Sequence, residues 1–358
     1  MAATMTGAIL PGNSTVEFRE FPVPEPGPGQ VLIKMRASSI CGSDIRCIYR
    51  EHLGKGPEGY QPGTISGHEP SGEIIKVGPN VKERKVGDRV VVYHITGCGN
   101  CRDCREGYMI SCQSEAHRAA HGWQRDGGHA PFMVSEENAC VPMPDSLTFV
   151  DGAFCACGFG TAWEALTRMG MSGADNLLIT GLGPVGLAAA MLGKALGAMH
   201  VFGTDISEAR IERAKAKGLV DFAYNAKTMG DEEILADIEA RTGGKKCERA
   251  IDCSAAPSAR VLAIRGTRQW GKCAFVGEGN NVDFLVSEYL IHPQITLYGS
   301  WVTSTRHLAD LVEFLDRHGL HPQDTSDPEF YFPLEQAAKA YELAEAGDCG
   351  KCCIVFED

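Results

Sequence analysis

A glycine-rich turn between an apolar run and an Ala-rich segment constrains the fold of this chain more than any other feature. The sequence NLLITGLGPVGLAAAMLGKALG places Gly181, Gly183 and Gly186 in GxGxxG order, after a strand-like run and at the start of a helix-like one. The first glycine permits a tight turn, the second lets backbone approach a pyrophosphate, and the third allows close helix–strand packing. The pattern therefore predicts a dinucleotide at the helix N-terminus, beside Pro184 and Val185.

Asp205 ends the next strand-like run, HVFGTD, where an acidic residue is expected to accept hydrogen bonds from the adenosine ribose. A carboxylate there favours NAD over NADP, because a 2′-phosphate would meet a like charge. Arg210 is the nearest basic residue that could favour NADP instead. The structural alternative is that the glycines only shape a turn and that Asp205 caps the helix begun at Ser207.

Strand-like and helix-like segments alternate after residue 158, which indicates βαβ units and a parallel sheet. Before that residue, short β-type runs are separated by Pro and Gly clusters, which is typical of a mainly β unit with long loops. The tail contains two amphipathic helix patterns, TRHLADLVEFLDRHG and LEQAAKAYELAEAG, and a closing strand, KCCIVFE. We therefore predict an α/β chain, with a doubly wound parallel sheet domain at 158–297 and a discontinuous, mainly β domain at 1–157 and 298–358.

Composition narrows the class of protein and its partners. A chain of 358 residues is too long for one core of ordinary size. Its 46 acidic and 34 basic residues give a charge of −12, which provides no attraction to nucleic acid or to anionic membranes.

The N-terminal run MAATMTGAILPGNSTVEF lacks the features of a secretory signal, so a cytoplasmic location is expected. The 15 cysteines then indicate metal thiolates and small buried side chains rather than disulfides.

Four cysteines lie close together in GCGNCRDCREGYMISC, within an expected lobe at 95–115. They are Cys98, Cys101, Cys104 and Cys112. Four thiolates at this spacing can close a tetrahedral shell around zinc, and a saturated shell leaves a structural role. An iron–sulfur cluster is disfavoured because no other redox feature accompanies these residues. A nucleic-acid-binding zinc module is disfavoured by the acidic balance and the lack of a basic recognition helix.

A second set of candidate ligands is dispersed along the chain. It comprises Cys41 in SSICGSD, His68 and Glu69 in SGHEPSG, and Cys157 in CACGFG. Two thiolates and an imidazole hold a zinc ion with one position open for water or an alcohol. Cys155 competes with Cys157 as the third ligand, and each cysteine alone also fits a small buried hydrophobe.

These segments together resemble the zinc-containing medium-chain dehydrogenase/reductase family, which includes alcohol, sorbitol and threonine dehydrogenases. The resemblance rests on GHEPSGEIIKVGPNVKERKVGDRV, CGNCRDCREGYMISC and GLGPVG, in this order, and covers nearly the whole chain. It implies a GroES-like catalytic domain, a Rossmann domain that binds NAD(H), one catalytic and one structural zinc ion, and a small-molecule alcohol substrate. It also implies a homodimer or homotetramer that pairs coenzyme domains edge to edge, to which the strand QITLYGSW could contribute.

The resemblance implies roles for individual residues. Cys41 and His68 are expected to be the first two ligands of the catalytic zinc, and Glu69 the carboxylate that can approach the metal. Asp44 resembles the carboxylate that orients the zinc-bound histidine. Ser43 resembles the hydroxyl that passes the alcohol proton toward solvent.

The third ligand is less settled. Polyol-type members have a Glu-Pro pair in the region that reads FCACGFGTAWEAL in this chain. Alcohol-type members have a cysteine followed four residues later by threonine, a pattern that Cys157 and Thr161 fit. Cys155 stays the competitor.

Arg46 departs from the family, because many relatives have a histidine at this position. A guanidinium stays charged near neutral pH and cannot relay protons, so the proton route is expected to end at Ser43 and water. We hypothesise that Arg46 pairs with a polar or anionic part of the substrate or cofactor. The alternative is a surface position or a salt bridge to Asp44.

The implied reaction transfers a hydride between NAD(H) and an alcohol, with zinc acidifying the substrate hydroxyl. The polar loops, Glu69 and Arg46 favour a secondary alcohol in a polyol, cyclitol or sugar derivative. The alternatives are a primary alcohol, an amino alcohol of the threonine type and, more remotely, a nucleotide-sensing protein without activity. A zinc-free reductase is disfavoured by the ligand set.

Two further groups of residues carry weaker expectations. His52, His121 and Trp123 fall in loops that could line the cleft, although their spacing does not single them out. Cys349, Cys352 and Cys353 superficially resemble a metal motif. We interpret them as part of a buried closing strand, because the alternation in KCCIVF explains them without a fourth ligand.

Overall fold

The computed structural model describes residues 3–54, 59–114 and 116–357. The chain folds into two compact units, which we call unit 1 (Met1–Gly160 and Thr303–Asp358) and unit 2 (Thr161–Val302). The expected division at 157/158 and 297/298 stays a prediction of where the functional domains end. Residues 1, 2, 55–58, 115 and 358 of these domains lie outside the described residues. Within the described residues, no helix combines the length and apolar character needed to cross a membrane.

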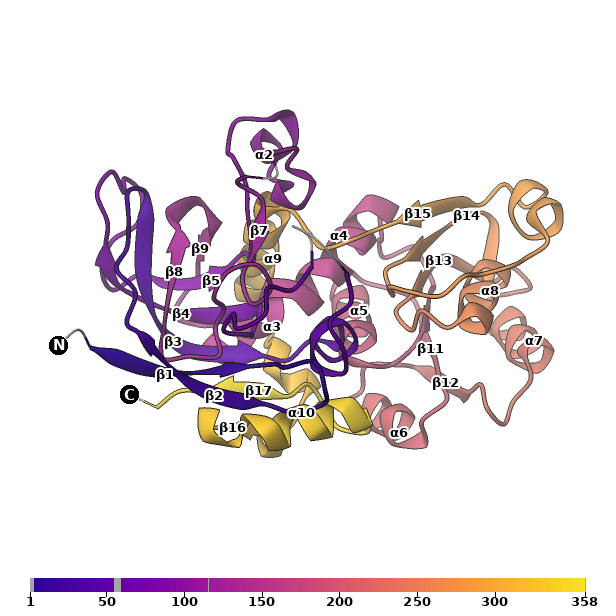
Figure 1. Ribbon diagram of the computed structural model, residues 1–358. Helices are drawn as coiled ribbons and strands as arrows, with labels where there is room; N and C mark the ends of the chain where they lie inside the picture. Colours follow the sequence, from indigo (N-terminus) through magenta and orange to yellow (C-terminus); the bar gives the residue numbers. More distant parts are fainter. Residues whose placement is uncertain (1–2, 55–58, 115, 358) are drawn as a thin grey trace. The chain divides into compact units, whose positions relative to one another are not determined.

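Unit 2 is built on a six-stranded sheet surrounded by helices (Figure 1). The spatial order is β12–β11–β10–β13–β14–β15, and every neighbouring pair is parallel. The strands are β10 (Leu177–Thr180), β11 (Val201–Asp205), β12 (Phe222–Asn225), β13 (Cys247–Asp252), β14 (Thr267–Phe275) and β15 (Thr296–Gly299). The intervening helices are α5 (Pro184–Ala195), α6 (Glu208–Ala216), α7 (Asp231–Arg241), α8 (Pro257–Arg265) and the π-helical turn η6 (Ser287–Ile291). The strand order reverses beside β10, so the predicted doubly wound, Rossmann-type sheet is confirmed.

The glycine-rich turn between β10 and α5 needs its glycines for steric reasons. Gly181 has a φ of 95°, a conformation that residues with a Cβ rarely adopt. A Cβ on Gly186 would lie 1.9 Å from the Gly181 carbonyl oxygen, so helix α5 can approach the strand only with glycine there. β10 and β11 are buried along their whole length, as expected for central parallel strands covered on both faces.

Unit 1 contains a mainly antiparallel sheet of seven strands in the order β16–β17–β3–β4–β5–β9, with β8 also paired to β3. Its strands are β3 (Gln30–Ser39), β4 (Glu69–Val77), β5 (Arg89–Val92), β8 (Phe132–Glu136), β9 (Cys140–Pro142), β16 (Tyr331–Phe332) and β17 (Cys353–Val355). Two small sheets accompany it, formed by β1 (Thr4–Ile9) with β2 (Glu17–Pro22) and by β6 (Ile95–Thr96) with β7 (Ala119–Ala120). The prediction of a mainly β unit is confirmed.

Helices of unit 1 lie at the ends of these strands and in the C-terminal tail (Figure 1). The longer ones are α3 (Phe149–Phe154), α9 (Thr305–His318) and α10 (Ala337–Ala346); α4 (Gly160–Met169) begins at the last residue before unit 2. Short helical segments are α1 (Gly42–Asp44), η1 (Ile45–Tyr49), α2 (Arg102–Arg105), η3 (Met109–Ser111), η4 (Glu137–Ala139), η5 (Cys155–Phe159), η7 (Pro322–Thr325), η8 (Pro328–Phe330) and η9 (Leu334–Gln336).

The C-terminal tail belongs to unit 1, as the discontinuous fold requires. Both amphipathic patterns form helices, α9 and α10, which end at the left-handed residues Gly319 and Gly347. The closing strand β17 pairs with β3 on one side and β16 on the other. It begins at Cys353, so Cys349 and Cys352 lie in the connection before the strand.

Replacing Gly186 by alanine is expected to destabilise unit 2. Overpacking of this kind costs about 1–3 kcal/mol, so the unfolding midpoint in urea should fall measurably. Gly230→Ala is the matched control, because nothing lies within 4 Å of its Cβ position. Equal midpoints for the two variants would contradict the close approach of α5 to the glycine turn.

Candidate active site and metal lobe

The ends of three paired strands assemble the first site. In the β3–β4 pair Ser39 lies opposite Glu69, so Cys41 follows one strand end and His68 precedes the other. On the opposite side of β3, Cys353 lies opposite Ser39. Continuing this antiparallel register brings Lys351 beside Cys41, and the backbone hydrogen bond from Ile40 N–H to the Cys352 carbonyl (2.9 Å) keeps the strands together there. Residues far apart in sequence therefore meet at one sheet edge.

Both thiols of this site sit where a helix departs from regular α geometry. Cys41 is the N-cap of α1, which continues directly into the π-helical turn η1. Cys157 lies within η5, a π-helical turn between α3 and α4, where the Gly160 N–H reaches the Cys155 carbonyl. Such π-bulges are frequent at functional sites, because the wider turn redirects side chains.

The described residues contain two groups of His, Cys, Asp or Glu side chains able to hold a metal ion, and this site is one of them. Its members are Cys41, His68, Glu69 and Cys157, whose ligand atoms all lie within 4.8 Å of one another. The two sulfurs are 4.0 Å apart. Cys155 is fully buried and does not belong to the group. The geometry thus favours Cys157 over Cys155 as the third ligand.

Asp44 fixes the orientation of the imidazole. Its Oδ1 lies 2.7 Å from Nδ1 of His68, and its Oδ2 accepts a hydrogen bond from the Cys41 backbone N–H (3.0 Å). Burial disfavours a charged His68, but the Asp44 carboxylate outweighs this and raises the pKa of His68 well above its usual value. With Nδ1 engaged, Nε2 is left to face the sulfurs, which is the arrangement expected of a zinc-ligating histidine.

Glu69 is held from three sides. Its Oε2 lies 2.6 Å from Nζ of Lys351 and accepts a hydrogen bond from the Ser39 hydroxyl at 2.5 Å, while Oε1 accepts one from the Gly158 N–H at 3.3 Å. Lys351 also donates to the Ile40 carbonyl (3.2 Å). Burial raises the pKa of Glu69, and the lysine charge opposes that rise. The carboxylate is therefore restrained next to the sulfurs rather than free to swing.

Lys351 and His94 are site residues that the sequence interpretation missed. The His94 ring packs against His68 with centroids 5.0 Å apart, and burial lowers the pKa of His94 to about 3, so this imidazole is neutral. Trp123 approaches His68 edge-on at 6.4 Å. A lysine directly before the apolar run CCIVF was the available signal for Lys351, since a charge beside a buried strand needs a partner.

The donor set fits a zinc ion. The hydrogen bond from Cys157 lowers the pKa of the Cys41 thiol well below its usual value, and the same contact raises the pKa of Cys157. The Cys41 sulfur is therefore readily deprotonated, while the Cys157 thiol donates its proton to the hydrogen bond between them. Two thiolates with an imidazole suit zinc. These residues would hold the ion.

The four-cysteine lobe is the second group. Cys98, Cys101, Cys104 and Cys112 converge with their sulfurs within 4.8 Å of one another. Backbone N–H groups of Asn100 and Cys101 lower the pKa of Cys98 to about 6, which favours a thiolate. A Cβ on Gly97 would lie 2.7 Å from the Cys104 sulfur, so the turn is shaped around the sulfurs. In Figure 1 the lobe that carries α2 stands away from the main sheet of unit 1. A metal ion bound in this lobe can take the place of a hydrophobic core, which so short a segment cannot form.

In unit 2, Gly181, Gly183, Pro184, Val185 and Gly186 form the turn and the first residues of α5, with Gly183 as N-cap. Asp205 ends β11, and its carboxylate accepts hydrogen bonds from the backbone N–H groups of Leu182 (2.7 Å), Ile206 (2.8 Å) and Ser207 (2.9 Å). Arg210 lies 3.6 Å from the same carboxylate. Asp205 therefore braces both the glycine turn and the segment that leads into α6, whose N-cap is Ser207. Its binding role stays a prediction.

The remaining expected residues have mixed placements. Ser43 and Arg46 are half-buried in α1 and η1, the helical turns that follow Cys41. His121 is fully buried, with its ring nitrogens 2.8 Å from the Asp126 carbonyl and 3.1 Å from the Ser135 hydroxyl, which indicates a structural role. His52 contacts the Leu10 carbonyl (2.8 Å).

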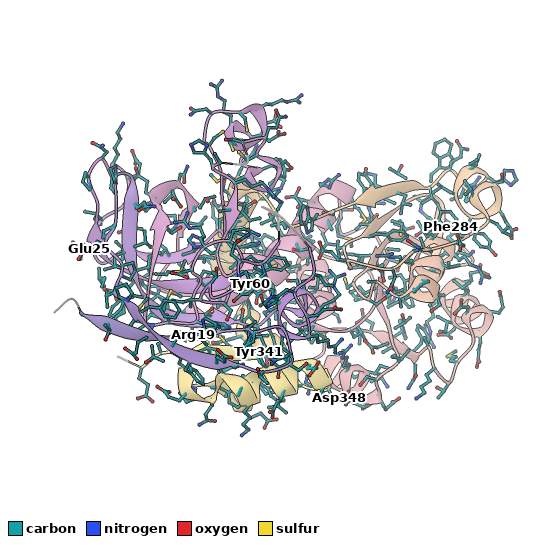
Figure 2. All side chains as sticks on the ribbon, in the orientation of Figure 1. Arg19, Glu25, Tyr60, Phe284, Tyr341 and Asp348 are labelled. Atoms are coloured by element: carbon teal, nitrogen blue, oxygen red, sulfur yellow. The ribbon has the colours of Figure 1, made fainter. Side chains whose placement is uncertain are left out.

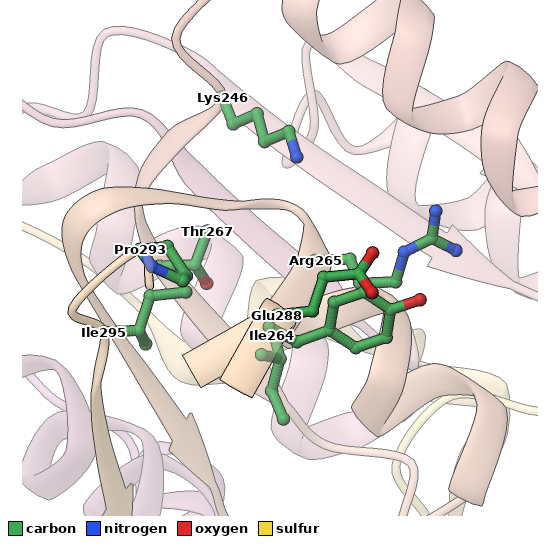
Figure 3. A pocket seen from close by; sticks show the side chains of 8 residues that line it. Lys246, Ile264, Arg265, Thr267, Glu288, Pro293 and Ile295 are labelled. Atoms are coloured by element: carbon green, nitrogen blue, oxygen red, sulfur yellow. The ribbon is translucent and has the colours of Figure 1, made fainter. Parts of the chain in front are cut away.

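A hollow of about 210 Å³ in unit 2 contains none of the expected site residues (Figure 3). It is lined by Lys246, Ile264, Arg265, Thr267, Glu288, Tyr289, Pro293 and Ile295. The metal-ligand group, by contrast, is a packed cluster in unit 1.

The fold and the two donor sets define a zinc-binding protein with a Rossmann-type unit. Comparison with known families agrees: residues 27–145 match the alcohol dehydrogenase GroES-like domain, and residues 184–317 match the zinc-binding dehydrogenase family. The chain belongs to the zinc-type medium-chain alcohol dehydrogenase family, and it is an oxidoreductase of that type. The predicted family and fold class are confirmed.

Several individual proteins are similar over nearly their whole length. An uncharacterized zinc-type alcohol dehydrogenase-like protein of Escherichia coli is 46% identical, covering 99% of each chain. Sorbitol dehydrogenase of Homo sapiens is 29% identical, covering 95% of this chain and 92% of the relative. Among solved structures, an NAD-dependent alcohol dehydrogenase is 26% identical with a TM-score of 0.85, covering 99% of this chain and 100% of the other. An alcohol dehydrogenase from a Thermus species shares the fold at 22% identity and a TM-score of 0.88, with the same coverage.

Zinc content distinguishes the two candidate third ligands. The purified chain is expected to hold two zinc ions, one for each ligand group. Cys157→Ala should reduce this to about one, because a thiolate ligand is lost. Cys155→Ala is the matched control and should retain both. Elemental analysis gives the count, and loss of zinc from Cys155→Ala but not from Cys157→Ala would reverse the assignment.

Proposed function

We propose that this protein oxidises a secondary alcohol in a polyol, cyclitol or sugar derivative, with NAD as hydride acceptor. The observation that carries this proposal is the grouping of Cys41, His68 and Cys157, because two thiolates and an imidazole suit a zinc ion with one position open. Glu69 belongs to the same group, and Lys351 holds its carboxylate beside these three side chains. Similarity to sorbitol dehydrogenases over most of the chain supports a polyol.

NAD is proposed because of the glycine turn and Asp205. Gly183 begins α5, so the first backbone N–H groups of the helix can bind a pyrophosphate. The Asp205 carboxylate would repel the 2′-phosphate of NADP. A solved relative described as an NAD-dependent alcohol dehydrogenase supports the same cofactor.

The chemistry expected of the bound cofactors is acidification of the substrate hydroxyl at zinc and acceptance of a hydride by the nicotinamide. The protein's own residues do the rest. Asp44 keeps the His68 ring in one orientation, and Lys351 with Ser39 restrains the Glu69 carboxylate. Ser43, two residues after Cys41, takes the proton from the substrate hydroxyl and passes it to water.

Arg46 is proposed to recognise the substrate. It lies half-buried in η1, two residues after Asp44, whose carboxylate oxygens already contact His68 and the Cys41 backbone. A guanidinium presents several fixed donors, which suits a substrate with hydroxyl or carboxylate groups. This favours a polyhydroxylated compound over an apolar alcohol.

A spectrophotometric screen of NAD reduction tests the proposed function. The zinc-loaded chain is assayed against polyols, cyclitols, sugar acids, threonine and primary alcohols, and polyhydroxylated secondary alcohols are expected to give the highest kcat/KM. Ser43→Ala should lower kcat by about 10²- to 10⁴-fold, because proton transfer is lost. Arg46→His should raise KM for the preferred substrate.

Three outcomes would count against parts of the proposal. Preference for threonine or a primary alcohol would move the substrate to the alternative class. An unchanged KM in Arg46→His would remove Arg46 from recognition. Turnover that survives complete chelation of zinc would overturn the function itself.

We also propose that the chain self-associates through the β15 edge of unit 2. β15 is an end strand of the sheet, paired to β14 along one side. Large exposed apolar side chains gather in the segments around it: Trp270, Leu285, Val286, Ile291 and Trp301, each at least 49% exposed. An open strand edge with apolar neighbours suits a second copy of the chain, related by a twofold axis.

Light scattering on a size-exclusion column tests this association. The wild type is expected to elute as a dimer or tetramer, and Trp301→Glu should raise the dissociation constant about 30-fold or more, because a large apolar anchor becomes charged. Val86→Glu is the matched control, since Val86 is 58% exposed in unit 1. A wild-type monomer at high concentration, or equal effects of both variants, would contradict the proposed surface.

A further inference from the structure

The connection between α10 and β17 contains a pair of thiols outside both metal groups. It reads Cys-Gly-Lys-Cys at residues 349–352, directly after Asp348, which Figure 2 labels beside α10. The sulfurs of Cys349 and Cys352 are 3.6 Å apart. Neither belongs to a metal-ligand group among the described residues.

The two thiols differ in accessibility. Cys349 is half-buried, and its thiol contacts the Leu343 carbonyl at 3.2 Å. Cys352 is 1% exposed and packs in the core of unit 1. An oxidant from solvent therefore meets Cys349 first, and Cys352 is positioned to react with it afterwards. The contact with Cys349 and burial both raise the pKa of Cys352, so this second step is expected to be slow.

The separation of the sulfurs exceeds the length of a disulfide bond. A disulfide needs about 2.05 Å between sulfurs, so the pair must approach by about 1.5 Å. The two-residue spacing between the cysteines is that of dithiol–disulfide proteins, in which the pair reacts with low-molecular-weight disulfides.

Lys351 lies inside the ring that this bond would close. Its carbonyl accepts a hydrogen bond from the Ser326 hydroxyl (2.9 Å), and its Nζ contacts Glu69 and the Ile40 carbonyl. The same four-residue turn thus carries the thiol pair and the cation that restrains Glu69. A disulfide between Cys349 and Cys352 would constrain this turn and so act on the position of the Lys351 side chain, which contacts Glu69 in the metal site.

We propose that Cys349 and Cys352 form a reversible oxidation site, which takes a low-molecular-weight disulfide such as glutathione disulfide as its oxidant. The Cys349 thiolate attacks the oxidant, forming a mixed disulfide and releasing one thiol. The Cys352 thiolate then attacks the Cys349 sulfur, forming the internal bond and releasing the second thiol. Two protons and two electrons pass from the protein to the oxidant, and an excess of free thiol reverses the reaction.

Cys353 is the matched control for this pair. It is fully buried in β17, and its sulfur contacts the Ile354 carbonyl at 3.6 Å. It is adjacent to Cys352 in sequence, but it begins β17, whereas Cys352 lies in the connection before the strand. Cys352 belongs to the core cluster that contains Tyr341 and Ile354, and Cys353 does not.

Peptide mapping tests the proposed bond. The zinc-loaded full chain is equilibrated in glutathione buffers of increasing oxidation, alkylated and digested with trypsin. Cleavage after Lys351 separates the two cysteines, so the bond appears as peptides 340–351 and 352–358 linked together. The linked pair is expected in the wild type and in Cys353→Ala, and not in Cys349→Ser or Cys352→Ala. A glutathione adduct on Cys349 without the linked pair, or a link that persists in Cys352→Ala, would overturn the proposal.

The effect on the metal site is measured separately and rests on the proposed function. Oxidation is expected to lower kcat several-fold in the wild type and in Cys353→Ala, with recovery on reduction, and to leave Cys352→Ala unchanged. Zinc content is followed in parallel, so that loss of metal from other thiols is recognised. A linked pair that forms with unchanged kcat would overturn the coupling through Lys351. A chain without NAD-dependent turnover would instead overturn the proposed function, because the peptide result does not depend on activity.

Discussion

The buried ion pair between Lys351 and Glu69 constrains the rest of unit 1. Their side chains are 4% and 0% exposed, and a charge removed from water in this way is stable only when it is paired and hydrogen-bonded. The pair joins the end of the chain to the start of β4. If the C-terminal segment left β3, the Glu69 carboxylate would stay buried without its cation, so the pair helps to hold the tail in unit 1. The same lysine lies beside two thiols whose deprotonation it favours.

The two metal groups are assembled by different physical routes. The four-cysteine lobe is local, because a turn at Gly97 and the short helix α2 bring together sulfurs that are already close in sequence. The other group depends on strand register and on two π-helical turns, so its members come from separate parts of the chain. A local group can form with little tertiary support, whereas the dispersed group requires the completed sheet. This difference agrees with a structural role for the first and a catalytic role for the second.

Local patterns made much of the fold predictable. The glycine turn, the alternation of strands and helices in unit 2, and the helices α9 and α10 all follow from steric and periodic rules that act within about twenty residues. The dispersed residues Cys41, His68 and Cys157 were candidates from their donor chemistry, but their individual ligand roles came through resemblance to a family, since no local rule connects them. Lys351 and His94 were missed, because each acquires its role from neighbours that the sequence does not place next to it. The closing strand is shorter than KCCIVFE suggested, since the turn at Cys349–Cys352 aims Lys351 at Glu69 before pairing begins.

By itself, the sequence determined the class of fold, the glycine turn and the four-cysteine lobe, because each depends on the chemistry of residues that are near one another in the chain. The tertiary structure decided which thiol lies beside Cys41 and His68, how Glu69 is restrained, and which cysteines of the tail face each other. These outcomes depend on the register between β3, β4 and β17. Shifting the pairing by one residue would turn every side chain to the opposite face, so no inspection of separate segments could settle them.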